Sequence, residues 1–461
     1  MKLYGLQFSI FASIFFFNTA SQSQTAALSL KFSTDSSYRL QFIEPWFNPA
    51  ETNVRAGLGN FKQKLQRKNS ELCVAFLGGS ITRAHDQYRQ QTINFIQSLH
   101  PSLKITGVNA GVSGTGTDLG ACRLEDQVLK YRPDLLFIEF AVNGGDFAAM
   151  EGIVRQVKKA SPTTAICFIY AISGEQHKVY TAGNIPDYIM GLEKIAEHYQ
   201  LPSIHMGLRA AQLESLGKLV WKSKDNAEGK IVFSKDGVHP TREGGDLYAS
   251  AIARGLRKLL DAKVFEHASI PNAIYGNEWE KATMLDPVQY SILTGQWQQM
   301  TTADSKDLST YATWFPYILK TETPNSSFCF SFSGTGFGFF DIGGPEVGQV
   351  LITVDELPAS LVRAPGSRNW ILSDDPASTA KNTLNRFNEY CFGRYRGQFE
   401  LVRIKDGVHN VCYVLSNDKI DKSTFVSKTT DEDFKINPLK YEKQTFYLGK
   451  ILLLGTPINK K

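Results

Sequence analysis

The feature that most constrains the fold of this chain is an alternation of short apolar runs and helical patterns between about residues 72 and 260. Five runs have the length of buried strands, at residues 73–77, 103–108, 135–140, 166–170 and 202–205. Apolar residues recur every three or four positions in the segments 92–99, 122–131, 153–160, 185–199 and 243–260. Apolar strands joined by helices predict a parallel sheet covered on both faces. Such sheets bind ligands beyond the carboxyl ends of their strands.

The pattern changes after about residue 265, to aromatic and β-branched runs broken by glycine, proline, asparagine and aspartate. Examples are residues 327–332, 336–340, 350–354, 399–404, 411–414 and 445–454. Many short strands separated by turn residues predict an all-β sandwich or jelly-roll domain. At 461 residues the chain exceeds what one hydrophobic core usually organises. We therefore expect a leader at 1–22, a strap at 23–70 that could pack on the β domain, an α/β domain at 71–262 and a β domain at 263–461.

Two glycine-rich segments follow predicted strands. In Phe-Leu-Gly-Gly-Ser-Ile-Thr (76–82), the glycines permit a sharp turn and leave the Ser80 hydroxyl accessible as a nucleophile. Taken alone, Gly-Gly-Ser after a strand is more often a simple turn. In Asn-Ala-Gly-Val-Ser-Gly-Thr-Gly (109–116), Gly114 could aim a backbone amide at an oxyanion. This segment lacks the spacing of a dinucleotide fingerprint or a P-loop, which argues against nucleotide binding.

Two further segments supply polar side chains. Asn143, after the third strand, could donate its side-chain amide to a developing negative charge, although a lone asparagine there more often caps a turn. Asp236-Gly-Val-His239 precedes the last helical segment, and an aspartate on one ring nitrogen would prepare the histidine to take a serine proton. No second cluster of histidine or cysteine accompanies it, so we expect no metal and no cofactor.

The pentapeptide Lys-Asp-Gly-Val-His occurs at 235–239 and again at 405–409. Thr241, after the first copy, is suited to cap the next helix, which would hold His239 at the end of the sheet. The second copy lies between two strand-like runs, so Asp406-Gly407 predicts a hairpin turn and His409 an ordinary strand residue. We therefore assign chemistry to the first copy.

In order and position, these four blocks together resemble the SGNH hydrolases, also called GDSL esterases, over residues 72–260. The family's serine, glycine, asparagine and histidine match Ser80, Gly114, Asn143 and His239. The resemblance implies a flavodoxin-like, three-layer α/β fold and an acyl-enzyme mechanism. It also implies a catalytic set of Ser80, His239 and Asp236, with an oxyanion hole formed by Ser80, Gly114 and Asn143.

The chain departs from the family pattern at two places. Gly78-Gly79-Ser80 replaces the frequent Gly-Asp-Ser, and this variant resembles that of secreted carbohydrate esterases within the family. Asn143 is followed by Gly144-Gly145 in place of the usual aspartate, and Asp146 could restore the lost loop contact. The chain contains no Gly-x-Ser-x-Gly, which argues against an ordinary α/β-hydrolase elbow.

The N-terminus predicts export. Lys2 is followed by an apolar run over 3–17 and then by small and polar residues, as in a secretory leader cleaved near residues 21–23. No later stretch is long and apolar enough to cross a membrane. We therefore expect a secreted or periplasmic protein. The net charge of +5 is spread without blocks of like charge, so no nucleic-acid partner is expected. Of the six cysteines, Cys391 and Cys412 could pair in an oxidising compartment.

The leader, the SGNH-like half and the β half together resemble a secreted carbohydrate esterase with an accessory module. The expected substrate is an acetylated polysaccharide or oligosaccharide. Sugar contacts could come from Arg83, His85, Tyr88, Tyr180 and Trp221, although surface packing explains each of them as well. Two alternatives remain: a hydrolase of lipid or aryl esters, and an inactive glycan-binding surface protein. The oligomeric state is open.

Overall fold

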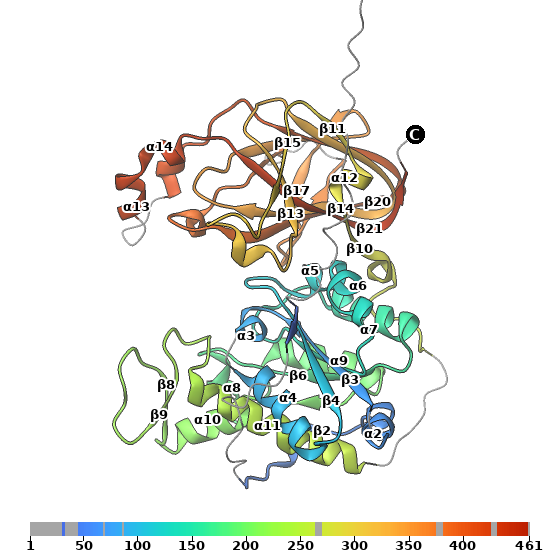
Figure 1. Cartoon of the computed structure of the whole chain (residues 1–461), viewed down its shortest axis with the longest axis vertical. Coiled ribbons are helices and arrows are strands. Elements are labelled where there is room, and N and C mark those ends of the chain that lie inside the picture. Colours follow the sequence, from blue (N-terminus) through green and yellow to red (C-terminus); the bar gives the residue numbers. More distant parts are fainter. Residues whose placement is uncertain are drawn as a thin grey trace, which may run out of the picture.

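The structure, a computed structural model, describes residues 30–32, 45–67, 70–84, 87–262, 270–374, 381–425 and 431–459. The leader expected at 1–22 and the expected sugar contact His85 lie outside these residues. Figure 1 shows two domains stacked along the long axis, an α/β domain below and a β domain above. No helix within the described ranges combines the length and the apolar character that a membrane span requires.

A seven-stranded sheet forms the centre of the α/β domain, in the order β1-β4-β3-β5-β6-β7-β2. Its strands are β1 (Lys31–Phe32), β2 (Thr52–Asn53), β3 (Glu71–Gly78), β4 (Lys104–Gly111), β5 (Leu135–Glu139), β6 (Ala165–Ile169) and β7 (Ser203–Ile204). Strands β3 to β7 are parallel, and β5 and β6 are buried along their whole length. Continuous apolar runs are required there, because helices cover both faces of the sheet.

The edge strands β1 and β2 both come from the segment 23–70. They pair antiparallel with β4 and β7, and so extend the α/β sheet at its two ends. The expectation that this segment packs on the β domain is wrong for its described strands. Two-residue strands of this kind carry no periodicity from which their partner could be predicted.

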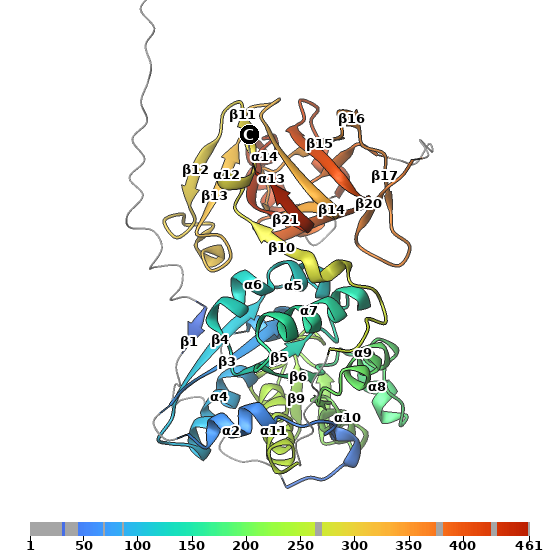
Figure 2. The same cartoon turned by 90° about the vertical axis from the view of Figure 1, so that its right-hand side faces the viewer.

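Helices lie on both faces of the sheet, with α5 and α7 on the side of the β domain and α2, α4 and α11 on the opposite side (Figure 2). The helices of this domain are α2 (Gly59–Leu65), α3 (Ser80–Arg83), α4 (Tyr88–Leu99), α5 (Thr117–Cys122), α6 (Leu124–Gln127), α7 (Phe147–Ala160), α8 (Gln176–Thr181), α9 (Asp187–His198), α10 (Leu208–Ser215) and α11 (Arg242–Asp261). A small parallel pair, β8 (Leu219–Lys222) and β9 (Ile231–Ser234), precedes α11. The doubly wound α/β architecture expected from the sequence is confirmed.

The second domain is built on one large, mostly antiparallel sheet whose main path is β12-β13-β21-β14-β20-β15-β16. Its strands are β10 (Ala282–Leu285), β11 (Ile292–Thr294), β12 (Gln298–Thr301), β13 (Tyr317–Thr321), β14 (Ser327–Gly343), β15 (Gln349–Val354), β16 (Leu357–Pro358), β17 (Leu361–Arg363), β18 (Trp370–Leu372), β19 (Thr383–Asn385), β20 (Arg396–Leu415) and β21 (Phe446–Ile458). The short helices are α12 (Pro287–Tyr290), α13 (Asp431–Ile436) and α14 (Pro438–Tyr441). The prediction of an all-β second domain is confirmed.

The second Lys-Asp-Gly-Val-His segment is not a hairpin turn. Strand β20 runs through it without interruption and pairs with β14 on both sides of an irregularity, where Gly334 faces Gly407 and Gly336 faces Arg403. The extra residues of β20 at this point form a bulge, which bends a strand without ending it. Asp406-Gly407 therefore lies in a bulge, and the prediction of a hairpin turn there is wrong.

The pairing of Cys391 with Cys412, which the sequence left open, does not occur in the structure. Cys412 is bonded to Cys329, its direct neighbour across the β14–β20 pair, and Cys391 is a free, buried thiol. The two partners are 83 residues apart, and only the pairing of the two long strands brings them together.

Helix α7 anchors the β domain on the α/β domain. Trp279 is fully buried against Gly152 of this helix, where an added β-carbon would stand 2.3 Å from the tryptophan β-carbon. Gln156 Nε2 donates to the Trp279 carbonyl at 2.8 Å, and Arg155 forms an ion pair with Glu280. A glycine is therefore required at position 152 for the two domains to approach this closely.

Candidate active site

The carboxyl ends of β3, β4 and β5 meet at the edge of the sheet that lies toward the β domain. Strand β3 ends at Gly78, and Ser80 then begins the short helix α3. The Ser80 hydroxyl lies 2.7 Å from Nε2 of His239, and Nδ1 of the same ring lies 2.6 Å from Oδ2 of Asp236. The structure thus brings the three residues of the predicted catalytic set into one hydrogen-bonded chain.

Asp236 is held as an anion. Its Oδ1 accepts hydrogen bonds from the backbone N–H of Val238 at 2.9 Å and of His239 at 2.8 Å, and from the Ser234 hydroxyl at 3.0 Å. Partial burial acts to raise the pKa of Asp236, but these hydrogen bonds and that of the imidazole outweigh it and hold the pKa well below its usual range. An ionised partner on Nδ1 leaves Nε2 as the acceptor for the serine proton.

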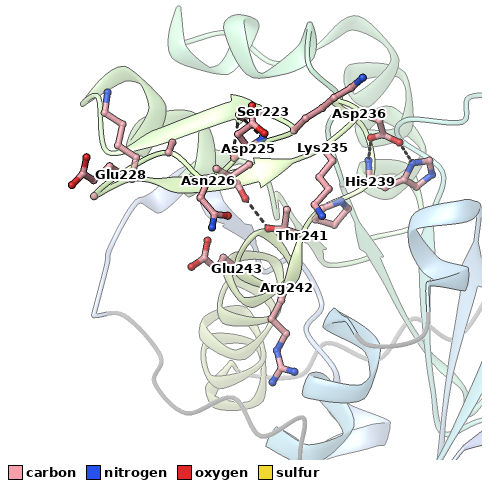
Figure 3. A pocket seen from close by; sticks show the side chains of 16 residues that line it. Ser223, Asp225, Asn226, Glu228, Lys235, Asp236, His239, Thr241, Arg242 and Glu243 are labelled. Carbon is pink, nitrogen blue, oxygen red and sulfur yellow. Dashed lines mark hydrogen bonds and ion pairs between the residues drawn. The ribbon is translucent and has the colours of Figure 1, made fainter.

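The conformation of Gly237 and a hydrogen bond from Trp221 hold the turn that carries Asp236 and His239. Gly237 has a φ of +92°, which glycine adopts without strain, and its carbonyl accepts a hydrogen bond from Trp221 Nε1 at 3.0 Å. Trp221 stacks on Phe233 with ring centres 4.2 Å apart. In Figure 3 Asp236 and His239 face each other beside a groove of about 910 Å³, which the segment 223–230 also lines. The histidine side chain is 44% exposed, so its reactive nitrogen is within reach of a large substrate.

The groups expected to bind an oxyanion lie beside Ser80. A β-carbon added to Gly79 would stand 1.8 Å from Asn143 Oδ1, so the asparagine side chain packs directly against the residue before the nucleophile. Asn143 Nδ2 makes no hydrogen bond to any residue that the structure describes, and Asn143 lines a cavity. Gly114 has a φ of +73°, the left-handed conformation that turns its loop at the end of β4.

Asp146 does not take the place of the aspartate missing after Asn143. Its side chain accepts a hydrogen bond from the Ala148 N–H at 2.9 Å and so caps helix α7. Gly144 O accepts the Thr117 N–H at 3.2 Å and leaves no room for a β-carbon at Gly116. Asp118 Oδ1 also accepts the Asp146 N–H at 3.1 Å, and the Thr117 hydroxyl donates to the Asp146 carbonyl at 2.8 Å. Helix α5 therefore holds the loop through both backbone and side-chain contacts.

A buried arginine, which the sequence did not indicate, holds the ends of β3 and β4 together. Arg123 donates from Nη1 to the Ala110 carbonyl at 2.5 Å and from Nη2 to the Gly78 carbonyl at 2.9 Å. Burial lowers the pKa of Arg123 to about 9. Close by, burial raises the pKa of Glu139 to about 7, and this carboxylate accepts a hydrogen bond from Thr82 at 3.1 Å. Both groups lie beneath the nucleophile and position its turn.

Three of the five expected sugar contacts are core residues. Tyr88 bonds to Thr82, Tyr180 to His205 and Trp221 to Gly237, and all three side chains are buried. Their assignment to the substrate is wrong, because each polar tip is already satisfied inside the domain.

Arg83 lies between the domains. It stacks over Trp314 with its guanidinium carbon 4.5 Å from the ring centre, and it donates to the Thr310 carbonyl at 3.3 Å. It therefore serves the domain interface in this structure.

The β domain reaches the loop that contains Gly114. Arg368 Nη1, from the loop between β17 and β18, donates to the Gly114 carbonyl at 3.1 Å. A cavity of about 960 Å³ opens beside Asn143 and is lined from both domains, with Asp146 and Tyr188 on one side and Arg363, Arg368 and Phe399 on the other. No sequence signal indicated Arg363 and Arg368, because neither spacing nor residue type distinguishes them from surface arginines. Within the described ranges, no group of three or more metal-ligating side chains is present.

Comparison with known proteins gives a similar structure but no similar sequence. No protein-family model matches the sequence, and neither does the sequence of any curated protein. The structure is similar to two solved structures of a two-domain esterase active on acetylated mannans, one of them co-crystallised with mannopentaose. Each has a TM-score of 0.63 and 19% sequence identity, over 88% of this chain and 97% of the other. This similarity confirms the expected fold, an α/β domain followed by a β domain.

The same comparison finds a catalytic mutant of Axe2, an acetylxylan esterase from Geobacillus stearothermophilus. The match covers 42% of this chain and 97% of the acetylxylan esterase, with 20% sequence identity and a TM-score of 0.33. At that score it adds nothing to the argument for this protein.

Proposed function

We propose that this protein is a serine esterase that removes acetyl groups from a polysaccharide or oligosaccharide through an acyl-enzyme. The observation that carries the proposal is the hydrogen-bonded chain from the Ser80 hydroxyl through His239 to Asp236, with distances of 2.7 Å and 2.6 Å. A nucleophile, a base and an orienting carboxylate at these distances are the arrangement that activates a serine.

In the proposed mechanism, His239 Nε2 takes the Ser80 proton while the serine oxygen attacks the ester carbonyl. The oxyanion is stabilised by the backbone N–H groups of Ser80 and Gly114 and by Asn143 Nδ2. The protonated imidazole then donates its proton to the sugar oxygen, which leaves as the alcohol. Water, deprotonated by the same imidazole, hydrolyses the acetyl-serine and regenerates the free hydroxyl. Asp236 stabilises the imidazolium in both steps.

An acetylated glycan is the substrate class that the surroundings of the site favour. The structurally similar esterase acts on acetylated mannans. In this chain the reactive histidine is exposed, and the cavity between the domains is larger than an acetyl group requires. A polymer chain could lie across such an opening with only its acetyl group inserted. We also propose, on the N-terminal pattern, that the protein is secreted or periplasmic.

The test measures acetate release from acetylated xylan, mannan and pectin, and fatty-acid release from long-chain esters. We expect acetate release by the wild-type protein and a loss of about 1,000-fold or more in Ser80→Ala and His239→Ala. His409→Ala, which removes the histidine of the second pentapeptide, serves as the matched control and should leave the rate unchanged.

Three results would redirect the proposal. Faster cleavage of long-chain esters than of acetylated glycans would favour a lipid or aryl esterase. Unchanged acetate release by Ser80→Ala would contradict the catalytic assignment. If no substrate is cleaved, binding of the same glycans would favour a non-catalytic glycan-binding protein.

A further inference from the structure

A second cavity, of about 530 Å³, begins at the loop that contains Gly114 and extends over the β domain. On the α/β side it is lined by Gly114 and Thr115, and on the β side by the end of β17 and the loop after it, by residues 385–390 and by the start of β20. The carboxylates of Glu389 and Glu400 belong to this lining. Gly114 is the residue whose amide faces the reacting carbonyl in the proposed function. A substrate whose acetyl group reaches Ser80 would therefore place its adjoining sugar units near this cavity.

Two of the arginines that line this cavity donate their hydrogen bonds to uncharged oxygens within the described part of the chain, and Asp118 is near enough to Arg368 only for a longer-range electrostatic interaction. Arg368 donates to the Gly114 carbonyl at 3.1 Å, and Arg396 donates to Asn388 Oδ1 at 3.5 Å and lies over the Tyr390 ring at 4.9 Å. Among the residues that the structure describes, neither guanidinium forms an ion pair with a carboxylate. Arg363, by contrast, lies over Trp370 at 3.7 Å and within 3.7 Å of a Glu400 oxygen.

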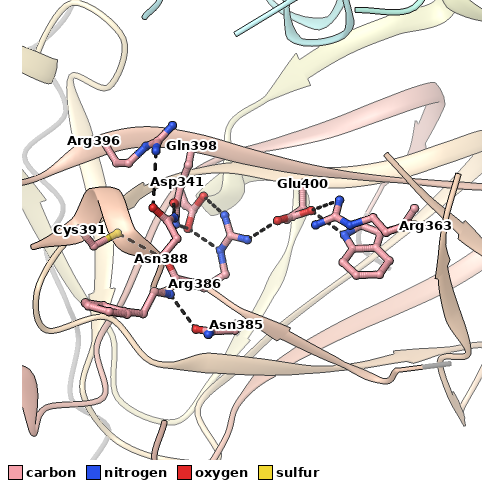
Figure 4. A network of polar contacts seen from close by, with 11 residues as sticks. Asp341, Arg363, Asn385, Arg386, Asn388, Cys391, Arg396, Gln398 and Glu400 are labelled. Atoms are coloured by element: carbon pink, nitrogen blue, oxygen red, sulfur yellow. Dashed lines mark hydrogen bonds and ion pairs between the residues drawn. The ribbon is translucent and has the colours of Figure 1, made fainter. Parts of the chain in front are cut away.

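Elsewhere in the same domain, one buried structural arginine is neutralised by two carboxylates. The buried Arg386 makes two hydrogen bonds to Asp341, at 2.7 and 2.9 Å, and a third to Glu400 at 2.7 Å. Glu400 also accepts the Trp370 indole N–H at 2.6 Å, so its oxygens are already occupied. Figure 4 shows the contrast between Arg386, which is held by two carboxylates, and Arg396, whose partner is an amide.

The two cations are also close to one another, because both approach Gly114. Arg368 Nη1 lies 3.1 Å from its carbonyl oxygen, and Arg396 Nη2 would lie 3.4 Å from a β-carbon added there. Burial lowers the pKa of Arg396 most; Cys391 and Tyr390 oppose this effect, and the charges of Arg394 and Arg368 add to it. Partly buried like charges that form no ion pair repel each other, and a bound anion would relieve that repulsion. Guanidinium groups bind carboxylate and sulfate oxygens in pairs of parallel hydrogen bonds.

We propose that Arg368 and Arg396 form an anion-binding subsite for the glycan, and that the protein acts on acetylated glycans with an anionic group near the acetylated sugar. This inference rests on the proposed function for the position of the acetyl group. The anionic group would be the carboxylate of a uronic acid or a sulfate ester, because both present the paired oxygens that a guanidinium binds.

Binding to the Ser80→Ala protein tests the subsite without relying on catalysis. Titration calorimetry would compare trigalacturonate, a sulfated galactose trisaccharide and neutral galactotriose. We expect at least one anionic trisaccharide to bind about tenfold or more tightly than the neutral one, the order of one charge-assisted hydrogen bond. The sulfated and uronic arms identify which anion is preferred, and the preference should weaken as salt rises.

Substitutions test whether Arg396 causes the preference for anionic trisaccharides. Arg396→Gln in the Ser80→Ala background should lower the anionic-to-neutral ratio of affinities about tenfold, and Arg396→Lys should lower it less because the charge remains. Arg257→Gln, which removes an exposed arginine of helix α11, is the matched control and should leave the ratio unchanged. Equal binding of neutral and anionic trisaccharides, or a preference untouched by Arg396→Gln, would overturn the inference.

Measurements of acetate release distinguish a failure of this inference from a failure of the proposed function. Acetate release would be measured from acetylated polygalacturonate and from its methyl ester, which carries the same sugar without the charge. Faster release from the free acid supports a uronate subsite. Equal, Ser80-dependent release from both polymers and from an acetylated sulfated galactan would overturn the subsite and leave the esterase intact. If no polymer releases acetate, the proposed function fails, and the calorimetric ratio alone decides the subsite.

Discussion

The approach of Asn143 to Gly79 predicts a specific coupling between these two residues. In Gly79→Ala the new methyl group would stand 1.8 Å from Asn143 Oδ1, 2.5 Å from its Cγ and 3.0 Å from its Nδ2. Real β-carbons do not come this close to other heavy atoms, so the carboxamide must move. The φ of Gly79 is −90°, so alanine meets no left-handed strain there. The expected effect is therefore the displacement of one oxyanion donor.

The magnitude follows from the loss of that donor. Removing one oxyanion-hole hydrogen bond lowers kcat by about 100- to 1,000-fold, and we expect this loss for Gly79→Ala and for Asn143→Ala alike. Independent effects would multiply, to a combined loss of about 10⁴- to 10⁶-fold. In Asn143→Ala, however, the atoms that the new methyl group would strike are absent. The double variant should therefore be about as active as Asn143→Ala alone.

The assay is steady-state hydrolysis of an aryl acetate by the four proteins of this cycle, with thermal unfolding to confirm that each is folded. Gly245→Ala is a matched control in helix α11, because its new methyl group would lie 3.4 Å from the β-carbon of Gln87, an ordinary contact. It should keep wild-type activity. If the two losses multiplied in the double variant, Gly79→Ala would act by some route other than Asn143, and the steric reasoning would be refuted.

Three further predictions concern the support of the site and the stability of the two domains. Trp221→Phe removes the 3.0 Å hydrogen bond to the Gly237 carbonyl and should lower kcat about three- to tenfold in the same ester assay, since one such bond contributes about 1 kcal/mol. Burial raises the pKa of Asp118 to about 6, so between about pH 4 and 6 the folded state holds a proton that the unfolded state has released. Stability should therefore fall as pH rises through this window, by up to about 3 kcal/mol, and denaturant titrations of Asp118→Asn should lack that contribution. Replacing Cys329 and Cys412 by alanine should lower the unfolding free energy by about 2 to 5 kcal/mol and abolish any effect of added reductant on unfolding.

The position of the candidate site was predictable because it depends on sheet topology. Ser80, Gly114 and Asn143 each follow an apolar strand, and parallel neighbours place their carboxyl ends at one edge, so adjacent strands bring these residues together. The prediction that aromatic residues contact sugar was wrong because it rested on residue type without knowledge of burial. Residue type alone cannot distinguish a tyrosine at a cavity from Tyr88, whose hydroxyl is satisfied by Thr82 in the core.

The features that could not be predicted depend on contacts between residues that lie far apart in the sequence. Arg368 contacts Gly114 across a separation of 254 residues, and the partner of Cys412 is decided by the register of β14 on β20. Register in a long antiparallel pair depends on the whole sheet and on its bulges. Local spacing therefore identified the α/β half of the site, whereas the β-domain half required the assembled sheet.

The repeated pentapeptide shows that the role of a motif depends on its backbone conformation. Three residues of extended chain separate two Cα atoms by about 10 Å, too far for a direct contact between an aspartate and a histidine at that spacing. In the first copy Gly237 turns the chain with a φ of +92°, and Asp236 folds back onto His239. In the second copy Gly407 lies within β20 and has no positive φ, and His409 pairs instead with Asp355, which lies 54 residues away in the sequence. The same five residues can orient a catalytic base only where the glycine reverses the chain, so the conformation of that glycine separates the two copies.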